Sequence, residues 1–453
     1  MTDDTAVPPA TAPAGLARPL AAPDASTGTS TGTTTATIGL AHGVALYACA
    51  VLGAGVLVLP GQAASLAGPA SLVAWGFSAL LGLALAFTFA ALAVRHPDAG
   101  GVATFTAAAF GPTLGGITGW WYLVAGSVGQ TVVALTAGYY VTAAAGVAQR
   151  WSPAVAAAVL ACAVLANLRG LRTGARVQVA LALGVAAILV TVVLVALPQV
   201  HRAELAPFAP AGVGGIGRAV VVLFFAFAGW EAVAHLSGEF RDVRRTLPAA
   251  TLITVVVVTV LYLGVALAVV GTRAYGTPAL DRIALGTVVQ RGLGLSALHV
   301  VAVAAVVICV GTTNAYVASV SRLGYALGRD GWAPAALARR NRHGAPVTAV
   351  LTVSAIGAVG LVGAALLGWG TDGIVVIPSV LVLATYLVAS AAAVRLLTGA
   401  RRLVAVLALV LLLLAVPYAG RGLAIPLLVA AVAAVTHRVR RGRRAATPPV
   451  SAP

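Results

Sequence analysis

Runs of about 20 apolar residues recur along this chain between residues 37 and 437, separated by short segments that carry arginine, proline or glycine. About 20 apolar residues is the length that an α-helix needs to cross the hydrocarbon core of a bilayer. A soluble domain of this size would carry about 25% charged residues, whereas only 9% of these 453 residues are charged. The pattern therefore predicts an all-α integral membrane protein.

Twelve of these runs are candidate transmembrane helices. Their ranges are 38–66, 70–94, 113–146, 152–168, 175–197, 215–240, 248–271, 293–320, 346–367, 373–394, 402–417 and 422–437. The last two are near the lower limit of length for a span. An even number of spans places both termini on the same side of the membrane.

The formal net charge of +17 reflects 28 basic residues, all of them arginine. They lie mostly in the short connections between apolar runs, which is the topology signal of a membrane protein and not a nucleic-acid-binding face, so we expect no nucleic-acid partner. With the N-terminus inside, 21 arginines fall on the cytoplasmic side and 7 on the other. The positive-inside rule then predicts a multi-pass protein of the cytoplasmic membrane with both termini in the cytoplasm.

The two ends differ in composition from the apolar body. Residues 1–36 are rich in alanine, proline, threonine and glycine. Such a segment cannot bury enough apolar surface to fold, so we expect a disordered N-tail. Residues 438–453 carry five arginines, and we expect a basic C-tail near anionic lipid headgroups.

The string GAGVLVLPG, residues 53–61, interrupts the first span. Gly53, Ala54 and Gly55 let the backbone leave helical geometry at low steric cost, and backbone that is unpaired in a membrane must line a cavity or be buried in protein. The half-helix that begins here presents amides that favour a carboxylate, and the half-helix that ends near Val51 presents carbonyls that suit an ammonium group. The alternative is that these small residues only permit close helix packing.

The string FFAFAGWEAVAHLSGEF, residues 224–240, interrupts the sixth span around Gly229. The carbonyls of Phe225 and Ala228 are candidate acceptors for an ammonium group. The rings of Phe225 and Trp230 are candidates to close over a bound substrate. Together the two interruptions predict a cradle for a zwitterion.

The second string also carries Glu231, His235 and Glu239, which share one helix face because they are four residues apart. A charge near the bilayer centre costs about 2.5–3.5 kcal/mol on insertion scales, so such residues face the protein interior and are functional candidates. Glu231 directly follows the break and is the candidate proton-titrating group, with a structural carboxyl as the alternative. His235 is a candidate proton relay or a simple hydrogen-bond partner. We expect Glu239 to pair with an arginine such as Arg241 or Arg244.

Polar residues in the eighth span, Thr312, Thr313 and Asn314, are candidates for contact with a sodium ion or with substrate. Interhelical hydrogen bonding is the alternative. The third span is flanked by four aromatic residues, most of which we expect to anchor it at the membrane interface, namely Trp120, Trp121, Tyr139 and Tyr140.

The interrupted spans are the first and the sixth, five spans apart. An odd repeat length inverts the second copy in the membrane, so the spacing predicts a 5+5 inverted repeat, and such paired interruptions indicate a transporter's binding site. We expect the first repeat to cover residues 37–213 and the second residues 214–395. Residues 396–437 then hold the last two spans, outside the repeat.

Four strings of this sequence resemble the amino acid permeases of the amino acid–polyamine–organocation superfamily. GAGVLVLPG resembles that family's helix-one signature, and residues 96–122, HPDAGGVATFTAAAFGPTLGGITGWWY, resemble its helix two-to-three segment. Residues 224–250 resemble the helix-six signature, and residues 314–334, NAYVASVSRLGYALGRDGWAP, resemble the end of helix eight. The helix-six string is most similar to that of the methionine and branched-chain amino acid exporters.

The resemblance implies a leucine-transporter-type fold of about 12 transmembrane helices, with substrate bound at mid-membrane. Phe225 then matches a gating aromatic, and Glu231 matches a glutamate implicated in proton dependence. The substrate-binding residues expected on this basis and from the breaks are Val51, Gly53, Ala54, Gly55, Phe225, Ala228 and Gly229.

We therefore expect a secondary active transporter of neutral amino acids that works by alternating access, with efflux of L-methionine, leucine, isoleucine and valine preferred over uptake. The helix-five lysine of some proton-coupled relatives is absent, because the chain has no lysine. Coupling would then use Glu231, His235 or a sodium ion, and we expect protons.

We expect no cofactor and no metal centre, because the seven histidines are scattered without metal-ligand spacing. The same scatter argues against a membrane-embedded enzyme, which would need a catalytic set. The expected partners are an amino acid substrate and the lipid bilayer. A monomer and a homodimer both remain open.

Overall fold

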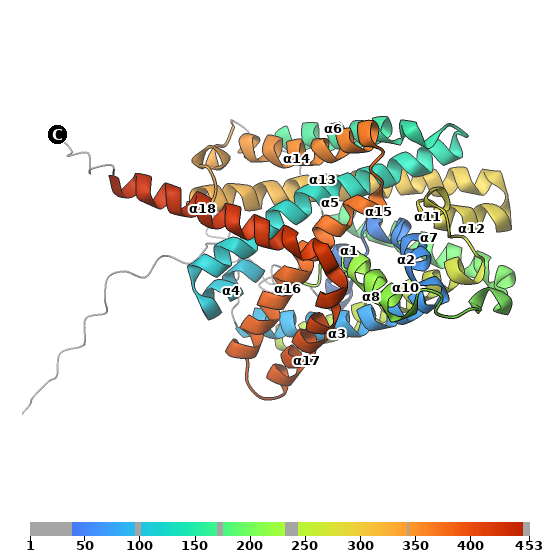
Figure 1. The fold of residues 1–453 in the computed structure, drawn as a ribbon, viewed down its shortest axis with the longest axis horizontal. Coiled ribbons are helices and arrows are strands. Elements are labelled where there is room, and N and C mark those ends of the chain that lie inside the picture. The colour runs from blue at the N-terminus through green and yellow to red at the C-terminus, as the bar shows by residue number, and fades with distance from the viewer. Residues whose placement is uncertain (1–38, 96–100, 170–174, 232–242, 342–343, 447–453) are drawn as a thin grey trace, which may run out of the picture.

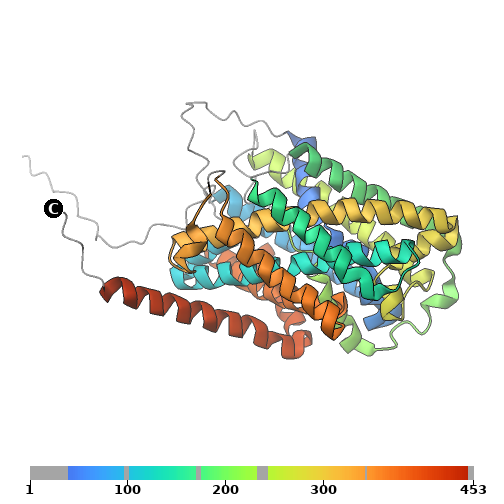
Figure 2. The same ribbon diagram turned by 90° about the horizontal axis from the view of Figure 1, so that it is seen from above.

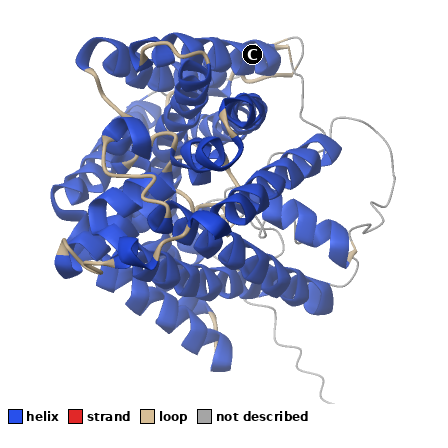
Figure 3. Cartoon of the chain, turned by 90° about the vertical axis from the view of Figure 1, so that its right-hand side faces the viewer, coloured by secondary structure: helices blue, strands red, loops and turns tan. Residues whose placement is uncertain are grey.

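The computed structural model describes residues 39–95, 101–169, 175–231, 243–341 and 344–446. Every regular element in these ranges is an α-helix or a 3₁₀ helix (Figure 3). The α-helices are α1 (Leu40–Val51), α2 (Leu59–Ala67), α3 (Ser71–Arg95), α4 (Val102–Phe110), α5 (Pro112–Ala144), α6 (Ser152–Leu168), α7 (Ala175–Ala196), α8 (Gly212–Leu223), α10 (Val243–Gly271), α11 (Pro278–Asp281), α12 (Ala284–Leu293), α13 (Leu295–Arg329), α14 (Val347–Leu367), α15 (Thr371–Ile374), α16 (Val376–Leu396), α17 (Gly399–Ala415) and α18 (Ala424–Ala446). Over these residues the prediction of an all-α protein is confirmed.

Each of the twelve predicted spans contains a helix or a pair of helices, and the sixth, 215–240, is helical only as far as Leu223 among its described residues. Eight described stretches are long and apolar enough to cross a membrane by length and composition. The number is below twelve partly because α1 and α8, with 12 residues each, are too short to qualify. In addition, α2 joins α3 and α17 joins α18 as continuous stretches. A total of twelve spans stays a prediction.

The long helices lie alongside one another (Figure 1), and α5 is at the centre of the packing. It contacts α4, α6, α13, α14 and α16, while α10 contacts α1, α3 and α7. The last helix, α18, runs along one edge of the bundle and its C-terminal end extends beyond it (Figure 2). The first segment, α1, packs mainly against α10 and α7.

Glycines allow α5 to approach its neighbours closely. A Cβ atom on Gly138 would meet the backbone of Ser152 in α6, and one on Gly126 would meet the side chain of Val320 in α13. In a bilayer the association of helices depends on van der Waals packing, and small residues at the contact permit it. The glycines of α5 therefore hold the centre of the bundle together.

The outer helices present large apolar side chains to the surroundings. Leu183 on α7, Val300 on α13, Leu366 on α14 and Leu403 on α17 are all exposed. A water-facing surface of this kind would mark an interaction site or an aggregation hazard, whereas hydrocarbon accepts it without cost. The distribution is that of a bundle whose outer surface contacts lipid.

Candidate functional site

The first predicted interruption is present. Helix α1 ends at Val51, Leu52 and Gly53 leave helical geometry, and a 3₁₀ helix (η1) covers Ala54–Leu57 before α2 begins. Gly53 is extended, and its amide donates to the carbonyl of Val51 at 2.8 Å. The first amides of a helix have no intrahelical acceptor, and those of Ala54 and Gly55 occupy this position. Polar backbone groups are therefore concentrated at this point inside the bundle.

The second predicted interruption is also present. Helix α8 ends at Leu223, and residues 224–231 form a series of turns. Gly229 has a φ of +116°, a conformation that side chains disfavour and glycine adopts readily. Ala228 and Gly229 are half-buried, whereas Phe225 and Phe227 are buried. The glycine in the middle of the string is thus the residue that permits the break.

The two interruptions lie against each other. A Cβ atom on Gly229 would collide with the carbonyl oxygen of Ala50 at the end of α1. The hydroxyl of Tyr262 on α10 is 3.1 Å from the carbonyl oxygen of Val51 and 3.4 Å from that of Ala226. One buried hydroxyl is therefore within hydrogen-bond reach of a carbonyl from each break.

Phe225 covers the first break. A Cβ atom on Gly55 would be 3.1 Å from Cδ1 of this ring, and one on Gly129 of α5 would be 3.1 Å from its Cε2. The ring thus fills the space between the 3₁₀ turn and α5. Its position means that the amides at the start of that turn lie in buried, apolar surroundings, where hydrogen bonds to a charged group are strong.

A cluster of aromatic rings supports the second break. The rings of Trp75 on α3, Phe227 and Tyr262 lie with centroids 5.3–5.9 Å apart. Trp230 packs edge-on against Tyr47 of α1, with centroids 5.6 Å apart, and the Tyr47 hydroxyl donates to the Trp230 carbonyl at 3.1 Å. Edge-to-face pairs of this kind add about 0.5–1.5 kcal/mol each beyond area burial. The turns of the second break are consequently held in a defined place.

Glu231 is buried beside this cluster, with 6% of its surface exposed. Its Oε2 accepts hydrogen bonds from the Gly229 amide at 3.1 Å and from the Tyr386 hydroxyl of α16 at 2.5 Å. The Gly229 amide also donates to the Tyr386 hydroxyl at 3.2 Å. The carboxyl therefore links the second break to α16.

The three polar residues predicted in the eighth span lie on α13 and have different surroundings. Asn314 accepts a hydrogen bond through Oδ1 from Asn167 of α6 at 2.8 Å, which is the interhelical bond weighed as the alternative. Thr313 is fully buried, and its Oγ1 has no hydrogen-bond partner among the described residues. Thr312 is half-buried. Thr313 is thus the residue of the three that keeps an unsatisfied oxygen.

Other predicted residues fall outside this description or lie elsewhere. His235 and Glu239 are outside the described residues. The expectation that Tyr140 is an interfacial anchor is wrong, because its ring is fully buried and its hydroxyl donates to the Leu57 carbonyl at 2.9 Å. Tyr139 is buried as well, beneath the guanidinium of Arg282. The need of a buried backbone carbonyl for a hydrogen-bond donor accounts for the position of Tyr140.

Three tyrosines of the site were not predicted from the sequence: Tyr47, Tyr262 and Tyr386. Each is a single phenol within an apolar run, remote from any arginine. Since a buried tyrosine usually bonds its hydroxyl to a partner, that isolation was an available signal. All three hydroxyls contact the second break or its carboxyl.

A polar network covers one end of the site region. Arg282, between α11 and α12, bonds to Asp372 of α15 at 3.2 Å and to Gln149 at 3.2 Å. Gln62 of α2 donates to Thr371 at 2.9 Å. These contacts join α2 to α15 and the α11–α12 connection to α15.

Asp281 lies beside this network, in the short helix α11. Burial raises the pKa of its carboxyl, and hydrogen bonds from Ser65 and from the Gly276 amide act in the opposite direction. The Gly276 amide donates to Oδ1 at 2.9 Å. Asp281 is therefore held by donors at this end of the bundle, whereas Oε1 of Gln62 and Nε of Arg282 have no hydrogen-bond partner among the described residues.

Comparison with known proteins gives a consistent result. A family model described as "Amino acid permease" matches residues 38–451. An amino acid permease of Bacillus subtilis described as uncharacterized, YecA, is 32% identical over 78% of this chain and 84% of its own length. The L-methionine/branched-chain amino acid exporter YjeH of Escherichia coli is 32% identical over 63% of this chain and 68% of its own. The branched-chain amino acid permease BcaP of Lactococcus lactis is 26% identical over 68% and 72%.

Proposed function

The chain belongs to the amino acid permease family, and from this premise we propose that it is a secondary active transporter that exports neutral amino acids, in particular L-methionine and the branched-chain amino acids. It is a multi-pass membrane protein, and its family consists of transporters and not of enzymes. The observation that carries the proposal is the meeting of two helix breaks beneath Phe225. Backbone amides and carbonyls come together there inside an apolar bundle.

The breaks provide opposite ends for a zwitterion. The amides of Ala54 and Gly55 begin a helical segment and bind the substrate carboxylate. The carbonyls of Val51, Phe225 and Ala228 accept from the ammonium group. Tyr262 is within reach of the Val51 carbonyl, so an arriving ammonium exchanges places with that hydroxyl or shares the oxygen with it.

An apolar substrate side chain is favoured by the walls of this region. Phe225, Phe227, Trp230 and Tyr316 surround the breaks, and Glu231 is the one ionisable carboxyl that the described residues place beside them. A charged side chain would lack a partner there and would lose its hydration. Methionine and the branched-chain amino acids meet no such penalty. The similarity to YjeH supports the same substrates.

Protons are the proposed coupling ion, carried by Glu231. The carboxyl bonds directly to the amide of Gly229 at the second break, so a change in its charge alters a hydrogen bond of the substrate-binding backbone. Sodium is the alternative, because the buried Thr313 oxygen lacks a partner among the described residues. Uptake is the alternative direction, and the similarity to the permease BcaP supports it.

Both termini are proposed to be cytoplasmic, on the distribution of arginines. A reporter that is active only outside the cytoplasm, fused to the C-terminus, should stay silent. Activity of that reporter would reverse the orientation.

The decisive experiment is counterflow in proteoliposomes. Purified protein is reconstituted with each of the twenty amino acids inside, and labelled substrate entry is followed with and without a pH gradient and with and without sodium. We expect exchange with methionine, leucine, isoleucine and valine, and dependence on the pH gradient. Exchange with none of the twenty would overturn the proposal, and a requirement for sodium would replace protons as the coupling ion.

A further inference from the structure

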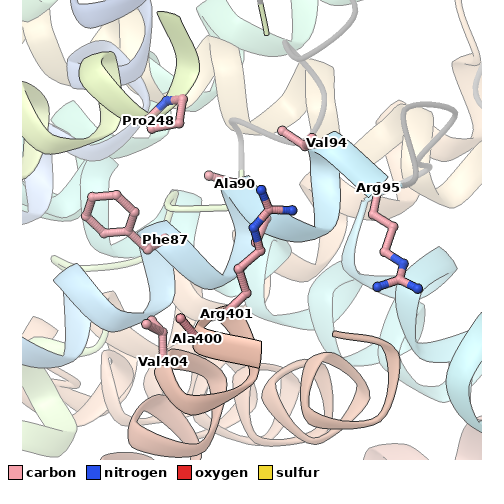
Figure 4. Close-up of a pocket in the computed structure, with 9 residues that line it drawn as sticks. Phe87, Ala90, Val94, Arg95, Pro248, Ala400, Arg401 and Val404 are labelled. Atoms are coloured by element: carbon pink, nitrogen blue, oxygen red, sulfur yellow. The ribbon is translucent and has the colours of Figure 1, made fainter. Parts of the chain in front are cut away.

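A groove lies between α3, α10 and α17, away from the two helix breaks (Figure 4). Its volume is about 720 Å³. Apolar side chains form most of its wall, including Phe87 and Val94 of α3, Pro248 of α10 and Val404 of α17. A groove of this size and composition suits a ligand with a substantial apolar part.

Two arginines flank this apolar wall. Arg95 is the last residue of α3, and Arg401 is the third residue of α17. Figure 4 shows Arg401 reaching across the groove toward α3. The ion pairs formed among the described residues involve Arg273, Arg282 and Arg329, and neither groove arginine takes part in them. The groove therefore combines an apolar wall with two cationic groups that carry no carboxylate partner in the described part of the chain.

Both arginines of the groove lie at the ends of candidate membrane spans. Arg95 ends one candidate span, and Arg401 lies in the first turn of another. Arginines at the ends of spans lie at the level of the lipid headgroups. An occupant of the groove would therefore have its polar part near the phosphates of the bilayer and its apolar part beside the acyl chains.

We propose that this groove is a binding site for an anionic phospholipid, with the headgroup phosphate between Arg95 and Arg401 and an acyl chain along Phe87, Val94 and Val404. Basic pockets between transmembrane helices bind anionic headgroups in this way. A free phosphate would use the two arginines but would leave the apolar wall exposed. A neutral lipid would use the wall but would not balance the two positive charges.

The site is tested with purified, delipidated protein in detergent. Dioleoyl phosphatidylglycerol, dioleoyl phosphatidylcholine and inorganic phosphate are each titrated, bound lipid is counted by native mass spectrometry, and the thermal unfolding midpoint is recorded. We expect the anionic lipid to bind and to raise the midpoint more than either of the others. Equal effects of the two lipids, or of inorganic phosphate alone, would overturn the assignment.

Matched variants locate the site. Arg401→Gln should weaken binding of the anionic lipid by about fivefold, the factor that corresponds to one basic residue near an anionic surface. Arg402→Gln is the control, because it removes the same charge from the next residue of α17, which does not line the groove. If the two variants bind the lipid equally well, the groove is not the site.

A second variant tests the apolar part without a change of charge. Ala400 is exposed and lines the groove, so Ala400→Trp should fill the space while both arginines remain. We expect loss of the bound lipid with an unchanged elution volume in gel filtration. Retention of the lipid by this variant would place it elsewhere on the protein.

Discussion

Glu231 shows how one buried residue connects ionisation to backbone geometry. Its carboxylate accepts from the Gly229 amide and from the Tyr386 hydroxyl, so one group joins the second break to α16. A buried carboxylate favours hydrogen-bond donors around it, and this preference changes when the group gains a proton and becomes neutral. The break is therefore the point at which protonation would affect the shape of the site.

Replacement of this carboxyl tests the role directly. Glu231→Gln keeps an oxygen that can accept from Gly229 but cannot ionise, so we expect counterflow that no longer varies with pH. Glu204→Gln is the matched control, because Glu204 pairs with Arg273 in a partly exposed ion pair remote from the breaks. A pH profile identical to that of the wild type would remove Glu231 from the coupling mechanism.

Gly55 is the glycine of the first break that lies against the Phe225 ring. A Cβ atom there would be 3.1 Å from the Phe225 ring, and overpacking in a filled space costs about 1–3 kcal/mol. We expect Gly55→Ala to weaken equilibrium binding of labelled substrate by about tenfold, the equivalent of ~1.4 kcal/mol. Gly76→Ala on α3, where a Cβ meets no atom within 4 Å, should bind as the wild type does. Equal affinity of both variants would show that Phe225 does not cover the binding site.

The Tyr262 hydroxyl is expected to stabilise both breaks together. Tyr262→Phe keeps the ring contacts with Trp75 and Phe227 and removes the hydroxyl beside the Val51 and Ala226 carbonyls. Because a lost buried hydrogen bond costs about 1 kcal/mol, the unfolding midpoint in detergent should fall. Tyr275→Phe, in a half-buried position beside Arg273, is the control. An unchanged midpoint would show that the hydroxyl does not hold the breaks.

At the scale of elements, the sequence was most informative where the chain departs from regular structure. Glycine within an apolar run predicted both breaks, and the structure confirms that α1 ends at Val51 and that Gly229 takes a positive φ. The contact between Gly229 and Ala50 was not predictable. That contact depends on how α3 and α10 bring α1 and α8 together. A hydropathy pattern indicates the length of a helix but not which other helices lie beside it.

The tyrosines illustrate the same limit. In sequence, a tyrosine near the end of an apolar run has the position expected of an interfacial anchor. For this reason the expectation for Tyr140 was wrong. Its burial follows from the approach of α5 to the 3₁₀ turn, where the Leu57 carbonyl needs a donor. Single-sequence patterns do not reveal a partner that lies 83 residues away.

The network at the α11–α12 connection allows a comparison of its members. Asp372→Asn removes an exposed ion pair and should cost less than about 1 kcal/mol of stability. Arg282→Ala should cost more, because Arg282 also bonds to Gln149 and lies 4.9 Å above the ring of Tyr139. Thermal unfolding of the two single variants and of the double variant separates these contributions. Equal losses in the single variants would mean that the ion pair alone matters.

In the whole molecule, apolar side chains and hydrogen-bonded polar groups occupy different regions. Apolar side chains cover the outer helices, whereas hydrogen-bonded polar groups are gathered at the breaks and at the α11–α12 end. A bundle of this kind presents an apolar outer wall to lipid and keeps the polar groups of the breaks inside, where a ligand can contact them. Because the chain belongs to the amino acid permease family, the class of that ligand is the amino acids. The direction in which the ligand moves is a property of the intact cell.

Efflux is tested in cells that overproduce the protein. A dipeptide that contains methionine or leucine is hydrolysed after entry and raises the internal amino acid concentration, so an exporter should increase tolerance and the amount of free amino acid released to the medium. Cells producing Gly55→Ala at the same level are the comparison, because we expect that variant to bind substrate about tenfold more weakly and so to release less amino acid. Faster accumulation of external methionine without increased release would instead identify an uptake permease, since the same breaks bind a zwitterion from either side of the membrane.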